Sequence, residues 1–219
     1  MLTRKIKALF SKGVRPHFGQ SGEDVLIRSH LRGVKNGVYL DLGAYDPFIL
    51  SNTAMLWAEG WNGCNVDANP FSVKRFIKHR PDDINIHGAI ITESEKRDGK
   101  SEVALYFERA SKDGLSATGS IVQRGEYKSS IIVPCLTIEE ILEKGQFKII
   151  DYLNVDLEGY DLKIILEFPF EKFSPKVIAI EDYYVDCAQI MKSPISDALM
   201  SKGYKLRARS SMTSVFVRN

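Results

Sequence analysis

The sequence predicts an α/β fold with a doubly wound, mostly parallel sheet and an antiparallel hairpin at its C-terminus. Short apolar runs alternate with segments that carry helix start and stop signals, which is typical of a parallel sheet with helices on both faces. Several of these runs end in an acidic side chain. The last two runs, residues 204–209 and 213–218, are joined by a short connection, which favours a hairpin.

The overall composition is that of an ordinary globular protein. The chain has 219 residues, of which 44% are hydrophobic and 26% charged, enough for one domain with a full core. A net charge of +2 gives no reason to expect binding to nucleic acid. The three widely spaced cysteines argue against a disulfide frame or a zinc site and for a cytoplasmic protein. The apolar runs are well short of the roughly 20 residues that a membrane span needs. The sequence does not indicate the oligomeric state, so a homo-oligomer is possible.

The N-terminal segment, residues 1–17, is expected to be separate from the main domain, residues 18–219. Its basic side chains interleave with apolar ones, so it could touch a membrane surface or an acidic partner. The alternative is a loosely held first helix packed on the domain. The apolar part is too short for a signal peptide.

The first helix of the domain is predicted over residues 22–32, with Ser21 as its N-cap and Gly33 as its end. Gln20 and Glu23 are expected to line a cofactor pocket. The alternative is that Glu23 merely suits the positive end of this helix.

A buried strand is predicted at residues 38–42, opened by the turn pair Asn36-Gly37. It carries Asp41 and is followed by Gly43, where a glycine lets the backbone turn sharply and lets a ligand approach closely. Ligands of open α/β sheets bind beyond the carboxyl ends of the strands, so we expect the cofactor here. The dinucleotide pattern G-x-G-x-x-G is absent.

The next helix is predicted to begin at Ser51 or Asn52 and to end before Gly60. A second strand follows and ends at Asp67, close to the spacing at which an acid accepts the ribose hydroxyls of a nucleotide. Asn69 is expected to cap a third helix, with Pro70 at its first position.

The middle of the chain is predicted to hold two strands and a long loop. Residues 84–91 form the first strand and contain His87, which is more often structural than catalytic in such a setting. Residues 102–108 alternate like a half-buried strand. Residues 109–130 lack apolar periodicity and are expected to be a mobile flap over the acceptor site. Lys112, Arg124 and Lys128 could meet an anionic acceptor there.

The last third of the chain repeats the alternation of helices and strands. A capping box at Thr137 starts a helix that ends at Gly145, and Ser193-Pro194 starts another that ends at Gly203. The strand between them, residues 149–155, leads into Asn154, Asp156 and Glu158, and alternation places the first two on one face. Glu158 could instead cap the following helix.

Four predicted strands thus end in acids, namely Asp41, Asp67, Asp156 and Glu181. Packing alone does not explain four carboxylates at one edge, because unpaired carboxylates repel one another. The pattern therefore predicts a ligand site at this edge.

Five segments carry a resemblance to a known family: residues 20–24 (QSGED), 39–46 (YLDLGAYD), 51–53 (SNT), 66–70 (VDANP) and 153–160 (LNVDLEGY). With these segments in this order, the chain resembles the FkbM family of class I methyltransferases, which use S-adenosylmethionine. The resemblance runs from about residue 18 to the C-terminus. Pro47 stands where relatives usually carry a glycine.

The resemblance implies a seven-stranded, Rossmann-like sheet whose last strand is antiparallel. It also implies roles for residues that would bind S-adenosylmethionine. Gly43 and Ala44 would pass under its methionine part, and Asp41 would help hold its ammonium group. Asp67 would hold the ribose, with Asn69 nearby. Residues 87–90, which include Ala89, would flank the adenine. Asn154 and Asp156 would face the methyl group.

Methyl transfer depends mainly on holding the methyl donor and the acceptor in line. A hydroxyl acceptor must also lose its proton to a general base or a metal-bound group. The candidates for this catalytic role are Asp156, His87 and Glu158, and paired carboxylates could hold Mg²⁺ through oxygen ligands. The resemblance favours O-methylation of a sugar or another small molecule. Two alternatives stay open: a non-catalytic cofactor-binding module with this fold, which Pro47 favours, and a nicotinamide-dependent dehydrogenase, which should show the missing glycine pattern.

Overall fold

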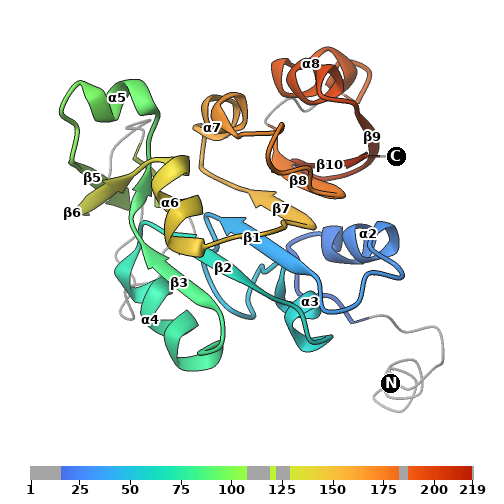
Figure 1. Cartoon of the computed structure of the whole chain (residues 1–219), viewed down its shortest axis with the longest axis horizontal. Helices are drawn as coiled ribbons and strands as arrows, with labels where there is room; N and C mark the ends of the chain where they lie inside the picture. Colours follow the sequence, from blue (N-terminus) through green and yellow to red (C-terminus); the bar gives the residue numbers. More distant parts are fainter. Residues whose placement is uncertain (1–15, 108–118, 122–128, 183–186, 219) are drawn as a thin grey trace, which may run out of the picture.

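The main sheet has seven strands in the order β3-β2-β1-β7-β8-β10-β9 in the computed structural model, which describes residues 16–107, 119–121, 129–182 and 187–218 (Figure 1). Strands β3, β2, β1, β7 and β8 run parallel, whereas β10 is antiparallel to both β8 and β9. The predicted mostly parallel sheet and its C-terminal hairpin are therefore confirmed. The bounds are β1 Val38–Leu42, β2 Asn62–Asp67, β3 Ile84–His87, β7 Tyr152–Val155, β8 Val177–Glu181, β9 Tyr204–Ser210 and β10 Thr213–Arg218.

Helices cover both faces of this sheet, as the doubly wound prediction requires. Figure 1 shows α2, α3 and α4 on one side and α6, α7 and α8 on the other. Strand alternation explains the division, because Leu40 and Leu153 pack with α6–α8 while Tyr39 and Tyr152 pack with α2 and α3. The bounds are α2 Glu23–His30, α3 Ala54–Ala58, α4 Pro70–His79, α6 Ile138–Gly145, α7 Asp161–Glu167 and α8 Pro194–Ser201.

Three predicted helix starts are confirmed by their hydrogen bonds. The Asn69 side chain accepts from the Phe71 amide at 3.0 Å, and Pro70 opens α4. Thr137 and Glu140 form a reciprocal capping box at α6. The Ser193 hydroxyl accepts from the amide of Ser196 at 3.0 Å.

Two predicted caps are wrong. Helix α2 begins after Gly22, whose φ is 82°, and the Ser21 amide donates to the Glu23 carboxylate at 2.7 Å. Helix α3 begins after Thr53, which gives no side-chain cap. In both places the polar groups are used for other contacts, such as the bond between Asn52 and Asn154.

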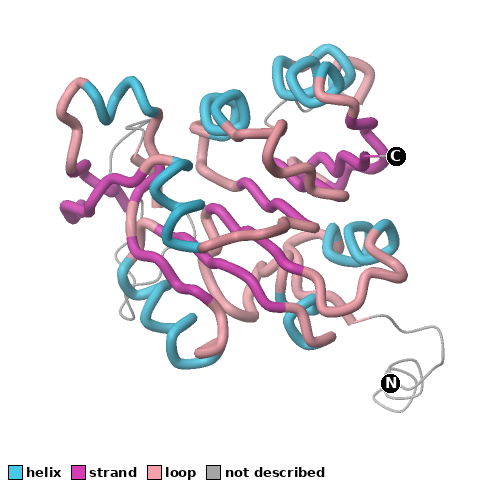
Figure 2. Tube along the Cα trace, viewed as in Figure 1, coloured by secondary structure: helices cyan, strands magenta, loops and turns pink. Residues whose placement is uncertain are grey.

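A second, three-stranded sheet was not predicted and divides the expected strand 84–91. Strand β3 ends at His87, and β4 (Ala89–Ile90) pairs instead with β6 (Ser129–Leu136), which also pairs with β5 (Glu102–Phe107). Figure 2 shows these strands as a separate group beyond β3. Helix α5 (Glu93–Arg97), which follows a capping box at Thr92, was not predicted either.

Several predictions fall on parts of the chain outside the described residues. These are the basic segment up to residue 15 and most of the predicted flap, including Lys112, Arg124 and Lys128. Of that flap, Ser120 pairs with Tyr106 of β5 and residues 129–130 begin β6. None of the helices in the described ranges has the length and apolar character needed to cross a bilayer.

Candidate active site

A pocket opens at the carboxyl ends of β1, β2 and β7, where the sequence predicted a ligand site. Its lining includes Gly43 after β1, Asp67 at the end of β2 and Asp156 after β7. The small sheet contributes apolar groups such as Leu105 and Ile90. The pocket thus combines an apolar wall with a few polar groups, as small-molecule sites commonly do.

Gly43 is fixed by the backbone on both sides of it. Its φ is 82°, and a Cβ placed on it would lie 1.8 Å from the carbonyl oxygen of Asp156. Its amide donates to the Val66 carbonyl at 2.9 Å, and the Asp156 amide donates to Leu42 at 2.9 Å. The sequence predicted a glycine here for a sharp turn and for close approach of a ligand, and the structure adds a third reason, because the backbone directly after β7 passes so close to the turn.

Asp67 is held at the pocket wall by two backbone amides. Its carboxylate accepts from Tyr45 at 2.7 Å and from Asn69 at 2.6 Å. Burial raises the pKa of Asp67 to about 6, although the two amide hydrogen bonds act in the opposite direction. A carboxylate has about four lone-pair sites, so two remain for hydroxyl donors in the pocket.

Asp156 opens onto the pocket and is surrounded by other acids. Asp156 is an exposed residue, so solvent limits the effect, but desolvation of its carboxyl by the surrounding protein still raises the pKa of Asp156, and Glu181, Asp161 and Glu158 raise it further. A carboxyl group with a raised pKa is a stronger base once ionised.

Glu158 also lines the pocket, with a left-handed φ of 50°. The alternative that Glu158 caps the next helix is not supported, because Asp161 accepts from the amides of Leu157 and Gly159, both at 2.9 Å. Asp161 was not singled out from the sequence, since its partners lie in a turn with unusual backbone angles.

His87 lies in a structural position. Its Nε2 is 3.0 Å from the carbonyl oxygen of Ala68, which can only accept a hydrogen bond. Among the described residues that line the pocket, Ala89, Gly88 and Asn69 are present and His87 is not. The contact favours a role in fixing the end of β2 over a role as the base.

A second polar group of predicted residues is buried behind the pocket lining. Asp41, 2% exposed, accepts from Asn154 at 2.8 Å and from Thr53 at 2.8 Å. Burial raises the pKa of Asp41, while these two hydrogen bonds oppose the rise. Both of its oxygens therefore already have partners within the protein. Ala44 is also buried and lies outside the lining.

Gln20 and Glu23 belong to the edge of this buried group. The Gln20 side chain is exposed, and its amide donates to the Glu23 carboxylate at 2.9 Å. Gly19 lies between Glu23 and Asn52, since a Cβ on Gly19 would be 3.0 Å and 2.9 Å from them. The structure thus brings Glu23 next to the Asp41–Asn154 pair through Asn52, but not into the pocket lining.

Asn52 is a candidate that sequence reasoning treated only as a cap. Its side-chain nitrogen donates to Asn154 at 3.1 Å. Its side-chain oxygen is buried, and no hydrogen-bond partner for it exists among the described residues. A buried amide oxygen without a donor is costly, so it suits a ligand donor such as an ammonium group. No sequence signal separates this role from capping.

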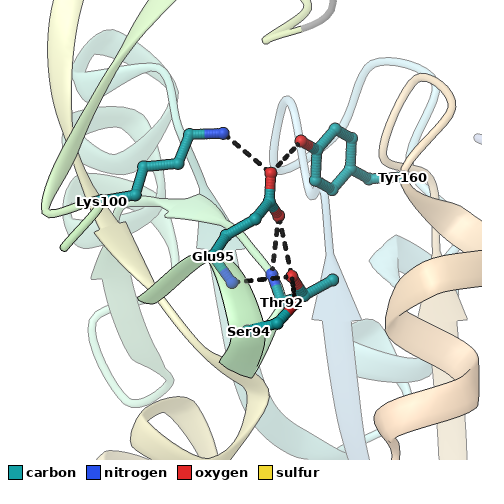
Figure 3. Close-up of polar contacts among 5 residues, drawn as sticks. All are labelled: Thr92, Ser94, Glu95, Lys100 and Tyr160. Carbon is teal, nitrogen blue, oxygen red and sulfur yellow. Dashed lines mark hydrogen bonds and ion pairs between the residues drawn. The ribbon is translucent and has the colours of Figure 1, made fainter. Parts of the chain in front are cut away.

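The rim of the pocket is fixed by a hydrogen-bonded group around Glu95 (Figure 3). The Glu95 carboxylate accepts from the Tyr160 hydroxyl at 2.7 Å and from Lys100 at 2.9 Å, and its other oxygen accepts from the Thr92 amide and hydroxyl. Desolvation acts to raise the pKa of Glu95, but these donors outweigh it and lower the pKa to about 2. Because Tyr160 lines the pocket, the group ties α5 to the pocket wall.

A metal ion would need several ligands close together at this edge. Within the described ranges, no three His, Cys, Asp or Glu side chains are grouped so that they could hold a metal ion. The possibility of Mg²⁺ therefore gains no support from this arrangement.

A mostly parallel sheet with an antiparallel hairpin and a pocket at its carboxyl edge defines a protein with a methyltransferase-like fold. The chain belongs to the methyltransferase FkbM domain family, whose model matches residues 41–205. Membership of this family supports methylation that depends on S-adenosylmethionine.

One solved structure with similarity to the chain is precorrin-6y C5,15-methyltransferase from Geobacter metallireducens GS-15. The two share 12% sequence identity with a TM-score of 0.41, over 94% of this chain and 90% of that one. So distant a likeness has no bearing on the chemistry of this chain. A comparison with curated proteins finds no match.

Proposed function

We propose that this protein transfers a methyl group from S-adenosylmethionine to a hydroxyl group of a sugar or another small molecule. The observation that carries the proposal is the position of Asp67 and Asp156 on the two sides of Gly43, facing one pocket. Asp67 is suited to a nucleoside and Asp156 to a reacting hydroxyl. Family membership supports the methyl donor.

The cofactor would be held by residues that the described contacts already fix. Asp67 has lone pairs left for ribose hydroxyls, with Asn69 beside it, and Ala89 and Ile90 offer an apolar surface to the adenine. The methionine part would lie near Gly43. Its ammonium group suits the Asn52 oxygen, with Asp41 and Asn154 behind it and Glu23 beside it.

S-adenosylmethionine would supply an electrophilic methyl group on a sulfonium. Asp156 would accept the proton that the acceptor hydroxyl loses, because its raised pKa brings it towards the range of an effective base. Glu158, at the same wall, would orient the acceptor. A metal-assisted route would instead require Mg²⁺, and activity that is lost with EDTA and restored by Mg²⁺ would reveal it.

Pro47 does not favour the alternative of a non-catalytic module once its position is known. It is buried, its carbonyl accepts from Arg80, and it is absent from the described lining of the pocket. The ring therefore shapes the loop behind the site. A dehydrogenase would still need the glycine pattern that this chain lacks.

Isothermal titration calorimetry on the parent protein and on Asp67→Ala tests the proposal. S-adenosylmethionine should bind the parent, and NAD should not. The variant should bind about 5- to 150-fold more weakly, which corresponds to the roughly 1–3 kcal/mol of hydrogen bonds to a charged group. Affinity of the parent should also fall as the pH decreases through about 6, where Asp67 takes up a proton.

The matched control is Asp82→Ala, which removes an exposed carboxylate from the turn before β3. It should bind S-adenosylmethionine as tightly as the parent. Parental affinity in Asp67→Ala, with circular dichroism showing both variants folded, would exclude Asp67 from the cofactor site. A parent that binds no S-adenosylmethionine would contradict the proposed function itself.

A further inference from the structure

A second groove lies between α2 and α3, apart from the active-site pocket. Its volume is about 460 Å³, within the range of pockets that take ligands. Its deepest residues are Leu31, Leu56 and Trp61, each at most 3% exposed. Val25 of α2 and Met55 of α3, both half-buried, present apolar side chains nearer the surface. The groove is therefore suited to apolar side chains from outside the two helices.

The groove also contains a buried polar group that lacks a partner. Arg28 of α2 and Glu59, which follows α3, form an ion pair that joins the two sides. The Arg28 Nε, however, is buried and has no acceptor among the described residues. A buried N–H without an acceptor is costly, so this one suits a carbonyl oxygen that an occupant would bring. The last carbonyls of a helix need such donors, and arginine side chains commonly supply them.

Residues 1–15 of the same chain lead directly into this groove, because Pro16 is part of its lining. The chain after Pro16 is fixed, since the Phe18 amide donates to the Asp24 carboxylate at 2.7 Å and the Phe18 carbonyl accepts from the Ser51 amide at 3.0 Å. Residues 1–15 are thus tethered at the groove. A short tether gives an effective concentration on the order of 1 mM, so a segment with a Kd of about 0.1 mM would occupy the groove about nine tenths of the time.

The sequence of residues 1–15 has the pattern that such a groove requires. Leu2, Ile6, Leu9 and Phe10 are spaced so that they share one face of a helix, and the lysines and arginines of the segment fall on the other faces. Gly13 suits the end of such a helix. The last carbonyls of the helix would then lie only a few residues before Pro16, at the groove.

We propose that residues 1–15 dock into the α2–α3 groove of their own chain as a short amphipathic helix. Its apolar face packs on Val25, Met55 and the deeper residues, and the Arg28 Nε donates to one of its last carbonyls. The basic face points away from the domain, and Arg32, an exposed residue at the rim, stays in solvent. This docking is independent of the proposed methyl transfer.

Amide hydrogen exchange, followed by NMR on the dilute full chain without any ligand, tests the docking. The amides of residues 6–12 should exchange about tenfold more slowly than in an unstructured peptide, as an occupancy of about nine tenths implies. Met55→Asp places a charge in the groove and should abolish this protection. An Asp in the first turn of a helix suits the helix dipole, so α3 should still form.

Two matched controls place the same side chain elsewhere. Met191→Asp changes a methionine that is 47% exposed and lies outside the groove, and it should leave the protection unchanged. Within the segment, Leu9→Asp should abolish the protection and Lys7→Asp, on another face of the expected helix, should retain it. Leu9 and Lys7 lie outside the main domain, so this pair decides the question even if Met55→Asp fails to fold.

Four outcomes would overturn the proposal. Residues 6–12 that exchange at the rate of an unstructured peptide in the parent would show that the segment does not dock. Protection that persists in a folded Met55→Asp would place the segment on another surface. Protection that rises with protein concentration would indicate a second copy of the chain as the partner. Protection that appears only with vesicles of anionic lipid would make the segment a membrane-binding element instead.

Discussion

At the scale of single residues, Gly43 sets the geometry of the pocket. Its φ of 82° lies in the left-handed region, and the backbone of Asp156 occupies the space where a side chain would begin. The same residue therefore fixes the turn after β1 and the place of the proposed base.

Gly43→Ala should lower the free energy of unfolding by clearly more than the roughly 1–2 kcal/mol of a left-handed alanine, because the Asp156 backbone must also move. Urea denaturation measures this loss. Gly60→Ala is a matched control, since Gly60 has a φ of 89° but nothing within 4 Å of its Cβ position. Equal losses of unfolding free energy in the two variants would show that the contact with the Asp156 backbone does not contribute to the cost of Gly43→Ala.

At the scale of secondary-structure elements, the Glu95 group joins helix α5 to the residue that opens α7. Thr92 and Glu95 form a reciprocal capping box, and the same carboxylate receives Tyr160 and Lys100 (Figure 3). One side chain thus both caps a helix and fixes a pocket wall.

Glu95→Gln should destabilise the protein by about 1–3 kcal/mol at pH 7, the usual range for hydrogen bonds to a charged group. The pKa of Glu95 is lowered in the folded state, so its contribution is complete above the ordinary value of 4.5 and is lost as the pH falls towards about 2. Urea denaturation at pH 7 and at pH values below 4.5 should show the gap between parent and variant narrowing.

The control for Glu95 is Asp98→Asn, which removes an exposed carboxylate next to the same helix. It should leave stability within about 0.5 kcal/mol of the parent. A constant gap between parent and Glu95→Gln at every pH would mean that packing, not charge, makes the difference.

At the scale of the whole molecule, the buried Arg80 connects three parts of the α2–α4 side. Its guanidinium donates to the Thr53 hydroxyl at 2.9 Å, to the Ser51 hydroxyl at 3.2 Å and to the Pro47 carbonyl. Thr53 in turn donates to Asp41 on β1. Arg80 therefore links the end of α4, the loop before α3 and the central strand.

Arg80→Met should cost about 3–5 kcal/mol, because it leaves buried oxygens without donors and Asp41 without a nearby positive charge. Urea denaturation gives this value, and Lys78→Met, an exposed change on the same helix, should cost less than about 0.5 kcal/mol. A loss below about 1 kcal/mol in Arg80→Met would show that the network is not needed for folding.

The sequence by itself determined the features that depend on short stretches of chain. The Asn69, Thr137 and Ser193 caps act within three residues, and strand alternation assigns faces residue by residue. Parallel strands must end at one edge, so the order of the elements along the chain is enough to gather the acids at the ends of β1, β2, β7 and β8.

Only the tertiary structure decided which of these acids faces the pocket. Asp41 and Asp67 both belong to strand ends, yet Asp41 is enclosed by Asn154 and Thr53 while Asp67 lines the cavity. It also decided the small sheet and the hydrogen bonds that Asn52 and Arg80 make with distant parts of the chain. The physical reason is that burial and hydrogen bonding between groups far apart in the chain depend on how the elements pack, which local propensity does not specify.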